Sequence, residues 1–443
     1  MSVSSLLPLA VMLTGSFLFI RLRFFPITRA GENAALFISA VREKENRRAL
    51  FLALAGTLGV GNIFGVAAGL MIGGVGSVFW LLVSSLFAMI IKYAETALSL
   101  HYLSGEGGGM HEVIRRVYGR LGAPLSKLYA LLCLLLSFFM GAGIQSAAVY
   151  DVAESALGIE PITVAFPLLA IVAFGTLGGG SKIEKLTAFI IPLTTIIYIL
   201  LSFSVIILNF DKLGTVICSI VSKAFAPGSA KGGLLAYFTS SAVKEGFSRG
   251  ILSNEAGAGT SAMAHSRAAG RAPRVAGLFG MCEVFFDTVI LCTLTALAVI
   301  ASVDDISLFS TPMSLVSAAF TESLGEWSGA VLLFCILAFA YSTVICWYYY
   351  GSECSRFVFG TRLSRLFTPV FLSLVPLSIA LSGDFLLLST DAVLLLMALL
   401  TLATLLFNAR TVGELTFGSP YQPRKVKNIP IDSVLQIDER SGL

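Results

Sequence analysis

Apolar stretches of about 20 residues, separated by short polar segments, recur along the chain from its start to Phe407. A helix of about 20 apolar residues is long enough to cross the hydrocarbon core of a bilayer. The pattern therefore predicts an all-α polytopic membrane protein with about eleven transmembrane helices. The predicted spans are Val3–Ile20, Leu50–Ile72, Val78–Leu100, Leu128–Val149, Ile162–Leu177, Leu186–Leu208, Gly233–Ala264, Val275–Ile300, Ser328–Tyr350, Leu366–Leu381 and Leu386–Phe407.

The distribution of basic residues predicts the orientation of these helices. If the N-terminus lies outside, most of the 30 Lys and Arg fall on the inner side, including those of the segment Lys92–Lys127. Cytoplasmic loops are rich in Lys and Arg, so the protein is expected in the cell (inner) membrane with its C-terminus in the cytoplasm. The poorly apolar span Gly233–Ala264 is needed, because without it Arg356 and Arg365 would face outward. A span with so many polar side chains is expected to face a cavity or the protein interior.

Composition narrows the class of protein. Hydrophobic residues make up 56% of the 443 residues and charged residues 13%, against about 45–50% and about 25% in soluble domains. This excludes a soluble enzyme, and the basic residues form no continuous face for nucleic acid, so the lipid bilayer is the expected environment. The seven cysteines have no CxxC spacing, and neither HExxH nor a Ser-His-Asp order occurs. We therefore expect no metal centre, no organic cofactor and no enzymatic activity.

Two of the predicted spans carry clusters of glycine near their middle. The first, Leu50–Ile72, contains GTLGVGN at 56–62, and Gly233–Ala264 contains GILSNEAGAG at 250–259. Each glycine costs a helix about 1 kcal/mol relative to alanine, so the clusters favour unwinding. Unwound backbone within a membrane is tolerated where it lines a cavity. The alternative is that the glycines only let helices pack closely.

The positions of the two expected breaks indicate an internal repeat. With the first span set aside, they fall in the first and sixth of about ten remaining helices, so each begins a five-helix repeat, the second inverted relative to the first. The helical spacing of Lys212–Phe225 and Asp304–Trp327 predicts lids over an outer vestibule. The expected parts are an extra N-terminal transmembrane helix at 1–24, an amphipathic helix on the inner surface at 25–49, a first five-helix repeat at 50–208, an outer loop at 209–232, a second repeat at 233–407 and a cytoplasmic tail at 408–443, partly disordered after Arg410.

The chemistry of the two breaks suits a small zwitterion. Amides of Gly59, Val60 and Gly61 at the start of a half-helix would attract a carboxylate. Carbonyl groups freed in Ser253–Gly257 would accept hydrogen bonds from an ammonium group. An α-amino acid carries both groups, so the sequence predicts an amino-acid site between the breaks.

Four segments resemble the alanine-or-glycine:cation symporter family, which are sodium-coupled carriers of the amino acid–polyamine–organocation superfamily. They are GTLGVGNIFGVA (Gly56–Ala67), SRGILSNEAGAG (Ser248–Gly259), FFDTVILCTLTAL (Phe285–Leu297) and AFAYSTVICWYYYG (Ala338–Gly351). The resemblance implies a LeuT-type 5+5 inverted repeat preceded by one extra helix. It also implies import of a small neutral amino acid, alanine-like or glycine-like, by symport with sodium.

The resemblance also implies site residues. The substrate contacts would be Thr57, Gly59, Gly61, Gln145, Ser253, Asn254, Gly257 and Trp347. A sodium ion would sit between the first broken helix and the ninth span, on the carbonyls of Ala55 and Leu58 and the hydroxyls of Ser342 and Thr343. Alternatively, the two hydroxyls only bond back to their own helix.

Several positions depart from the family pattern. Ala147 replaces an asparagine of the fourth span, Phe64 replaces a small residue, and Glu283 is an added acid one turn before Asp287. Two close carboxylates would hold one proton between them, which is possible proton coupling, whereas the alternative is a polar face toward the vestibule. Alternative functions are therefore a proton-coupled carrier of another small zwitterion, or an amino-acid sensor (transceptor).

The remaining charged and aromatic residues have simpler interpretations. Glu255 is a gate or coupling carboxylate, or else a partner of freed backbone amides or of Arg249. We expect His111 and His265 to be solvated near the inner surface. Trp80 and Trp327 are expected to act as interfacial anchors.

Overall fold

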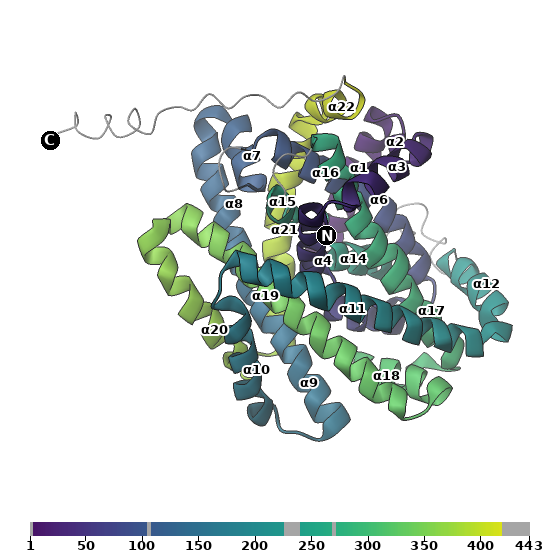
Figure 1. Ribbon diagram of the computed structural model, residues 1–443. Helices are drawn as coiled ribbons and strands as arrows, with labels where there is room; N and C mark the ends of the chain where they lie inside the picture. The colour runs from purple at the N-terminus through teal and green to yellow at the C-terminus, as the bar shows by residue number, and fades with distance from the viewer. Residues whose placement is uncertain (1–2, 104–107, 226–239, 268–271, 419–443) are drawn as a thin grey trace, which may run out of the picture.

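The computed structural model describes residues 3–103, 108–225, 240–267 and 272–418, and nearly all of them are helical (Figure 1). No β-strand occurs within these ranges. The helices are α1 (Val3–Arg21), α2 (Phe25–Thr28), α3 (Ala30–Val41), α4 (Lys44–Thr57), α5 (Phe64–Gly73), α6 (Ser77–His101), α7 (Met110–Val117), α8 (Gly122–Leu136), α9 (Gln145–Leu157), α10 (Pro161–Thr176), α11 (Gly180–Leu208), α12 (Leu213–Ala224), α14 (Ser241–Asn254), α15 (Ser261–Ser266), α16 (Pro273–Val284), α17 (Thr293–Ser302), α18 (Pro312–Leu324), α19 (Trp327–Leu363), α20 (Phe367–Leu377), α21 (Gly383–Phe407) and α22 (Ala409–Phe417).

Length and composition identify several of these helical segments as membrane spans. Six segments of the described chain are long and apolar enough to cross a bilayer, and the bent pair formed by α4 and Val60–Gly73 makes a seventh if it counts as one span. The helix α10 and the Leu6–Arg21 part of α1 are shorter apolar helices. The other predicted spans also fall on helices where they are described, since residues 233–239 lie outside the described residues. The number eleven stays a prediction.

Both expected helix breaks are present. The helix α4 ends at Thr57, and the chain continues through the 3₁₀ turn Val60–Asn62 into α5 after a bend of 63°. The helix α14 ends at Asn254, and α15 begins at Ser261. We call residues 58–59 the first break and residues 255–260 the second break. In the second break Glu255, Gly257 and Gly259 have φ of 54°, 92° and 75°, a conformation that glycine adopts without strain.

Glycines beside α6 serve close packing, which was the alternative explanation for the cluster that contains Gly250. A Cβ on Gly250 of α14 would lie 2.1 Å from Ser84 Oγ of α6. Further along α6, a Cβ on Gly280 of α16 would lie 2.7 Å from Thr96 Oγ1. Glycine therefore lets α14 and α16 approach α6 closely, while the glycines after Asn254 shape the second break.

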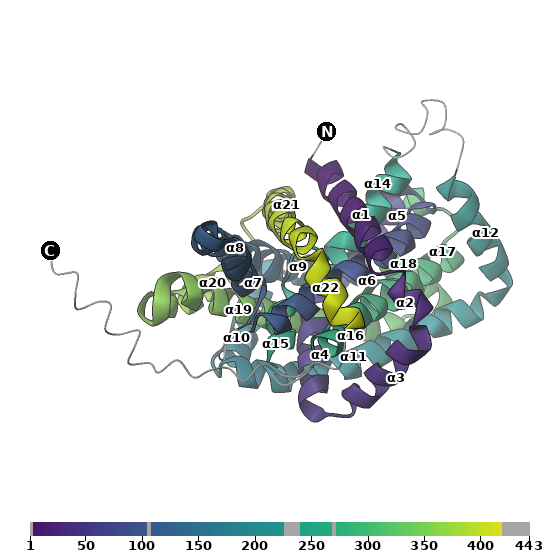
Figure 2. The same ribbon diagram turned by 90° about the horizontal axis from the view of Figure 1, so that it is seen from above.

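The shorter peripheral helices lie toward the two ends of the helix bundle. The helices α2, α3, α7 and α22 lie at one end of the bundle, and α9, α10 and α18 reach the opposite end (Figure 1). The extra N-terminal helix α1 packs on α6, α14 and α21 (Figure 2). The expected inner-surface helix is α3, and the expected outer lids contain α12 and α18. Of the tail after Arg410, where partial disorder was expected, residues 411–417 are helical and belong to α22, while residues 419–443 lie outside the described residues.

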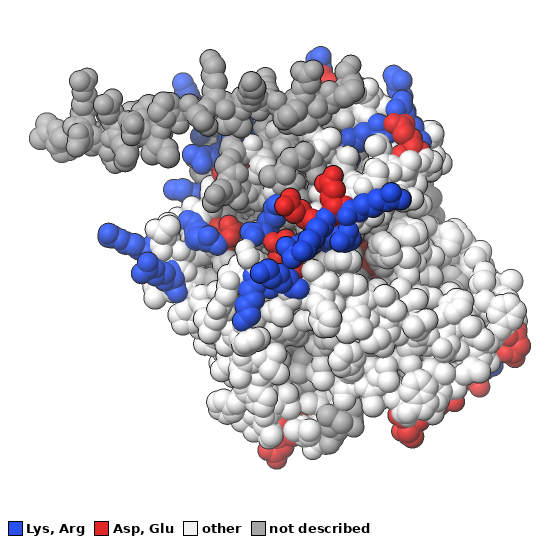
Figure 3. Space-filling model, in the orientation of Figure 1, with Lys and Arg blue, Asp and Glu red and all other residues white. Residues whose placement is uncertain are grey.

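Charged side chains divide the surface into zones. On the face in Figure 3, Lys and Arg gather in the upper half together with several acidic side chains, and further acidic side chains lie at the lower rim. A broad band without charged side chains separates these two zones. Large apolar side chains of α11, such as Phe189, Leu200 and Ile207, are 69%, 62% and 56% exposed. An apolar belt of this kind suits contact with lipid.

The two segments predicted to act as lids line a second cavity, of about 740 Å³, together with the end of α5. Across it, Lys212 Nζ and Asp304 Oδ1 form an exposed ion pair at 3.3 Å. At the start of the second lid, Asp305 accepts hydrogen bonds from the amide and hydroxyl of Ser307, and these bonds lower the pKa of its carboxyl group.

Candidate functional site

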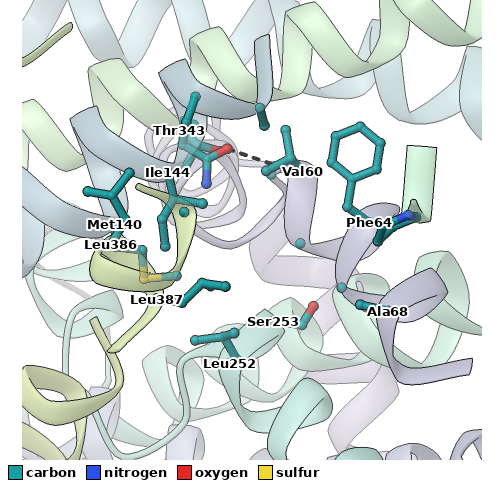
Figure 4. Close-up of a pocket in the computed structure, with 18 of the residues that line it drawn as sticks. Val60, Phe64, Ala68, Met140, Ile144, Leu252, Ser253, Thr343, Leu386 and Leu387 are labelled. Atoms are coloured by element: carbon teal, nitrogen blue, oxygen red, sulfur yellow. Dashed lines mark hydrogen bonds between the residues drawn. The ribbon is translucent and has the colours of Figure 1, made fainter. Parts of the chain in front are cut away.

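A cavity of about 250 Å³ lies against the first break and against Leu252 and Ser253, just before the second break (Figure 4). In Figure 4, Val60, Phe64 and Ala68 form one wall, Leu252 and Ser253 another, and Met140, Leu386 and Leu387 a third. Most of the lining is apolar. The polar side chains that line the cavity are those of Thr57, Gln145, Asp151, Arg249, Ser253 and Thr343.

Side chains from neighbouring elements satisfy donors of the first break. The amide of Gly59 donates to Asn62 Oδ1 at 3.0 Å, and the amide of Val60 donates to Gln145 Oε1 at 3.3 Å. Two of the three amides expected to bind a carboxylate therefore already have partners, and Gly61 lines the cavity. A Cβ on Gly59 would lie 2.9 Å from Thr343 Oγ1 and 3.0 Å from Gln145 Oε1, so close approach requires glycine here.

The second break is held by two side chains that the sequence analysis did not single out. The amide of Gly257 donates to Glu95 Oε1 of α6 at 2.7 Å. The hydroxyl of Tyr129 on α8 donates to the carbonyl of Ala258 at 2.6 Å. Both side chains are fully buried. The unwound backbone is therefore fixed by the protein itself at these two positions.

Asp287 links the two broken helices. Its Oδ1 accepts a hydrogen bond from Asn62 Nδ2 at 2.6 Å, beside the first break. Its Oδ2 accepts hydrogen bonds from the hydroxyl of Ser253 at 2.9 Å and from that of Thr288 at 2.7 Å. Ser253 is the last but one residue of α14, before the second break. Asp287 lies in the π-helical segment Phe285–Cys292, a type of segment that is frequent at functional sites.

The four proposed sodium oxygens are only partly brought together. The hydroxyl of Thr343 donates to the carbonyl of Leu58 at 3.2 Å, so α19 meets the first break as expected. The hydroxyl of Ser342 bonds to the carbonyl of Phe339 in its own helix at 2.9 Å, which was the alternative for this residue. Ala55, Ser342 and Thr343 are all buried.

The structure divides the expected substrate contacts into two groups. The cavity is lined by five of them, Thr57, Gly59, Gly61, Gln145 and Ser253. It is also lined by Phe64 and Ala147, two of the positions that differ from the family pattern. Asn254, Gly257 and Trp347 do not line it: Asn254 bonds Thr288, Gly257 faces Ala398 and Leu402, and Trp347 packs on Gly141.

Buried ionic side chains form a cluster near the second break. Lys92 belongs to this cluster, so its assignment to the inner side with the loop residues was wrong. Lys92 lies within α6 with its ammonium group fully buried, and not in an inner loop. Its Nζ contacts Glu283 Oε1 at 3.0 Å and bonds the hydroxyl of Ser261. Glu283 Oε2 lies 3.5 Å from His265 Nε2. The carboxylates of Glu283 and Asp287 thus have separate partners, although they share one helix.

Three other expectations were wrong. His265 and His111 are 1% and 6% exposed, so neither is solvated. Burial and, to a smaller extent, the charge of Arg115 lower the pKa of His111, on α7, to about 4. Trp80 is buried and its Nε1 donates to the carbonyl of Ala224, so it does not anchor an interface. Arg249 pairs with Glu245 at 3.3 Å and not with Glu255.

Comparisons with known proteins agree on one family. The sequence model of the sodium:alanine symporter family matches residues 1–427. A sodium/alanine symporter, AgcS, of Methanococcus maripaludis is 32% identical over 81% of this chain and 82% of its own length. An uncharacterized transporter of Haemophilus influenzae is 30% identical over 97% of this chain and 96% of its own. A probable sodium/glutamine symporter, GlnT, of Bacillus subtilis is 28% identical over 83% and 79% of the two chains.

Solved structures show the same fold at low identity. The crystal structure of MhsT in complex with L-phenylalanine matches 84% of this chain and 97% of the MhsT chain with a TM-score of 0.55 and 13% identity. At this identity the match establishes the shared fold and nothing about the ligand.

Proposed function

Because the chain belongs to the sodium:alanine symporter family, we propose that it imports a small neutral amino acid by symport with sodium. The membership makes it a multi-pass membrane transporter. The observation that carries the proposal is the cavity between the two helix breaks, where Thr343 of α19 meets the carbonyl of Leu58. One place thus offers hard oxygens for a sodium ion and polar groups for a zwitterion.

The substrate would lie in the cavity with its charged groups toward the breaks. Gln145 Oε1 accepts from the Val60 amide, so its Nε2 is available to donate to a carboxylate. Gly61 brings backbone to the cavity surface on the same side, and Thr57 and Ser253 offer hydroxyl groups. The apolar wall of Met140, Leu386 and Leu387 would hold the side chain. Asn254, Gly257 and Trp347 do not line the cavity, so they would support the residues that do and would not touch the substrate in this conformation. The Nε1 atom of Trp347 has no hydrogen-bond partner among the described residues.

Sodium would bind where α19 meets the first break. We assign its ligands to the carbonyls of Ala55 and Leu58 and the hydroxyls of Ser342 and Thr343. Each hydroxyl now donates its hydrogen to a carbonyl, and each oxygen keeps lone pairs that a cation attracts. A bound ion would replace the Thr343 hydrogen bond and hold α19 against the first break. This contact gives sodium a direct influence on the shape of the amino-acid site.

The protein would lie in the cell (inner) membrane, with its N-terminus outside and its C-terminus in the cytoplasm. The distribution of Lys and Arg along the sequence supports this orientation. In that orientation the cavity opens outward, because Asp151, Pro312 and Gly383 of its lining belong to outer segments. The repeats 50–208 and 233–407 would then move against each other to expose the site to the cytoplasm.

One experiment distinguishes sodium symport from the two alternative functions, a sensor and a carrier driven by protons. Proteoliposomes preloaded with unlabelled L-alanine are given a trace of labelled L-alanine in sodium or in choline buffer. We expect transient accumulation of label in sodium and none in choline, since a carrier exchanges solute without an imposed gradient. A sensor would be stabilised thermally by L-alanine without any exchange. A carrier driven by protons alone would exchange equally in choline. Proton coupling was considered for Glu283 and Asp287, but these carboxylates have separate partners, which does not favour a shared proton.

A further inference from the structure

Glu255 is a buried carboxylate inside the second break that the proposed sodium symport does not use. It is fully buried, and its backbone has φ of 54°, which is uncommon for a residue other than glycine. Its Oε2 accepts one hydrogen bond, from the hydroxyl of Thr260 at 2.8 Å. Its Oε1 has no hydrogen-bond partner among the described residues. A single neutral donor is a weak environment for a buried negative charge.

The nearby basic side chains are already engaged by other carboxylates. Arg249 pairs with Glu245, and Lys92 contacts Glu283 and bonds Ser261. None of the ion pairs within the described ranges includes Glu255. Lys92 is a more distant electrostatic partner that Glu255 shares with Glu95 and Glu283.

The charges of this region do not balance if every group is ionised. Even with His265 protonated beside Glu283, two positive groups, Lys92 and His265, stand against the four fully buried carboxylates of Glu95, Glu255, Glu283 and Asp287. An uncompensated buried charge costs several kcal/mol, so the cluster favours binding of a further positive charge. The titratable or charged groups that face Glu255 from the elements around it are Lys92 of α6, Tyr129 and Cys133 of α8, Glu283 of α16, Asp287 of the π-helical segment, and Cys346 and Tyr350 of α19.

We propose that Glu255 is a proton-binding site of the transport cycle, with the proton on Oε1 in the conformation seen here. In this state the carboxyl group is neutral, its O–H bond lies on the oxygen without a partner, and Oε2 accepts from Thr260. When the region is open to the outer water, the carboxylate takes up a proton and the O–H bond forms. When the region later opens to the inner water, this bond breaks, the proton enters that water and the carboxylate is left hydrated. The coupling to transport rests on the proposed function, whereas the protonation of Glu255 does not.

The cavity supports this order of events. It reaches Leu252 and Ser253, which precede the break, and Glu255 is not part of its lining. Glu255 is therefore closed off from the cavity in the conformation seen here. The backbone that carries it is held by Glu95 and Tyr129, so a change in the break moves the carboxyl group and its surroundings together.

Infrared spectroscopy of the purified full chain in lipid nanodiscs tests the protonation without any substrate. At pH 7 the wild type should show a carboxylic-acid C=O band that Glu255→Gln loses and Glu322→Gln keeps, because Glu322 is an exposed carboxylate on α18. In Thr260→Val the band should remain and move to higher frequency, since Oε2 loses its hydrogen bond. A band unchanged in Glu255→Gln overturns the proposal. Thermal unfolding of each variant confirms that it is folded.

Transport in proteoliposomes tests the coupling. With equal sodium on both sides and an alkaline interior, wild-type protein should concentrate labelled L-alanine above its outside level, and Glu255→Gln should reach that level without exceeding it. A wild type that never responds to the pH gradient, although a sodium gradient drives it, overturns the coupling. If no gradient drives uptake, the proposed function fails, and the infrared result alone decides on the proton site.

Discussion

The hydroxyl of Thr343 on α19 donates a hydrogen bond to the carbonyl of Leu58 at the first helix break, with an oxygen–oxygen distance of 3.2 Å. Both residues are buried, and they come from segments far apart in the sequence. This contact joins the amino-acid cavity to the proposed sodium ligands.

Thr343→Ala should therefore weaken sodium binding more than Ser342→Ala does. Thr343 contacts the break, whereas the Ser342 hydroxyl bonds its own helix. Loss of one oxygen ligand of a cation is worth on the order of 1.5–3 kcal/mol, so the concentration of sodium for half-maximal thermal stabilisation should rise about tenfold to a hundredfold. Equal effects of the two substitutions would contradict the assignment.

Ala147→Asn should shift the selectivity of the carrier. Ala147 lines the cavity, and the asparagine adds an amide to a mostly apolar wall. We expect stronger competition by glycine and alanine and weaker competition by larger apolar amino acids. Competition against labelled L-alanine measures the shift, and Val149→Ile, buried on the same helix away from the lining, is the control. An unchanged competition profile would show that position 147 does not shape the site.

Gly59→Ala and Gly61→Ala should separate the folding of the break from the binding of substrate. A Cβ added at Gly59 would lie too close to Thr343 and Gln145, so Gly59→Ala should lower the unfolding temperature as well as transport. A Cβ on Gly61 meets no atom within 4 Å and projects from a cavity-lining position. Gly61→Ala should therefore reduce substrate affinity at nearly unchanged stability. Gly413→Ala on α22, equally unobstructed, is the control and should change neither.

Asp287→Asn should loosen the link between the two broken helices. The carboxylate accepts from Asn62 and Ser253 at once, and an amide in its place offers one acceptor oxygen in place of two. A buried donor left without its acceptor costs about 1–3 kcal/mol, so thermal stability and transport should both fall. Asp304→Asn at the exposed outer ion pair serves as the control and should have little effect. Wild-type stability of Asp287→Asn would argue against the link.

His111 should make the stability of the protein depend on pH. An unfolded histidine binds a proton below about 6.5, while burial keeps His111 neutral down to about 4. Unfolding therefore takes up a proton between these values, and the free energy of unfolding should fall as pH decreases from about 6.5 to about 4, by on the order of 1.4 kcal/mol per pH unit. His111→Gln should flatten this part of the profile of unfolding temperature against pH. An identical profile in both proteins would exclude His111 as its source.

The sequence predicted the helix breaks because glycine clusters carry a local signal. The segment 56–62 and the segment 250–259 unwind in the structure close to where their glycines lie, and Gly250 in addition lets α14 approach α6. The resemblance to a family led to most of the polar side chains that line the cavity, among them Gln145 and Thr343.

The partners of the breaks could not be predicted in the same way. Asn62, Tyr129 and Asp287 act through contacts between residues far apart in the sequence, and their distances depend on packing. Lys92 and Glu95 did give a signal, since two charges three positions apart in an apolar helix are rare in membranes. That signal was lost when Lys92 was assigned to an inner loop by counting charges.

Accumulation of labelled L-alanine in proteoliposomes under an inward sodium gradient, at equal pH on both sides, tests sodium symport most directly. The account predicts that L-alanine accumulates above its outside concentration and that this accumulation disappears when sodium is replaced by choline. The Thr343→Ala variant should remain folded and should not accumulate L-alanine. Accumulation of the same size in choline, or none in sodium for any small neutral amino acid, would contradict it.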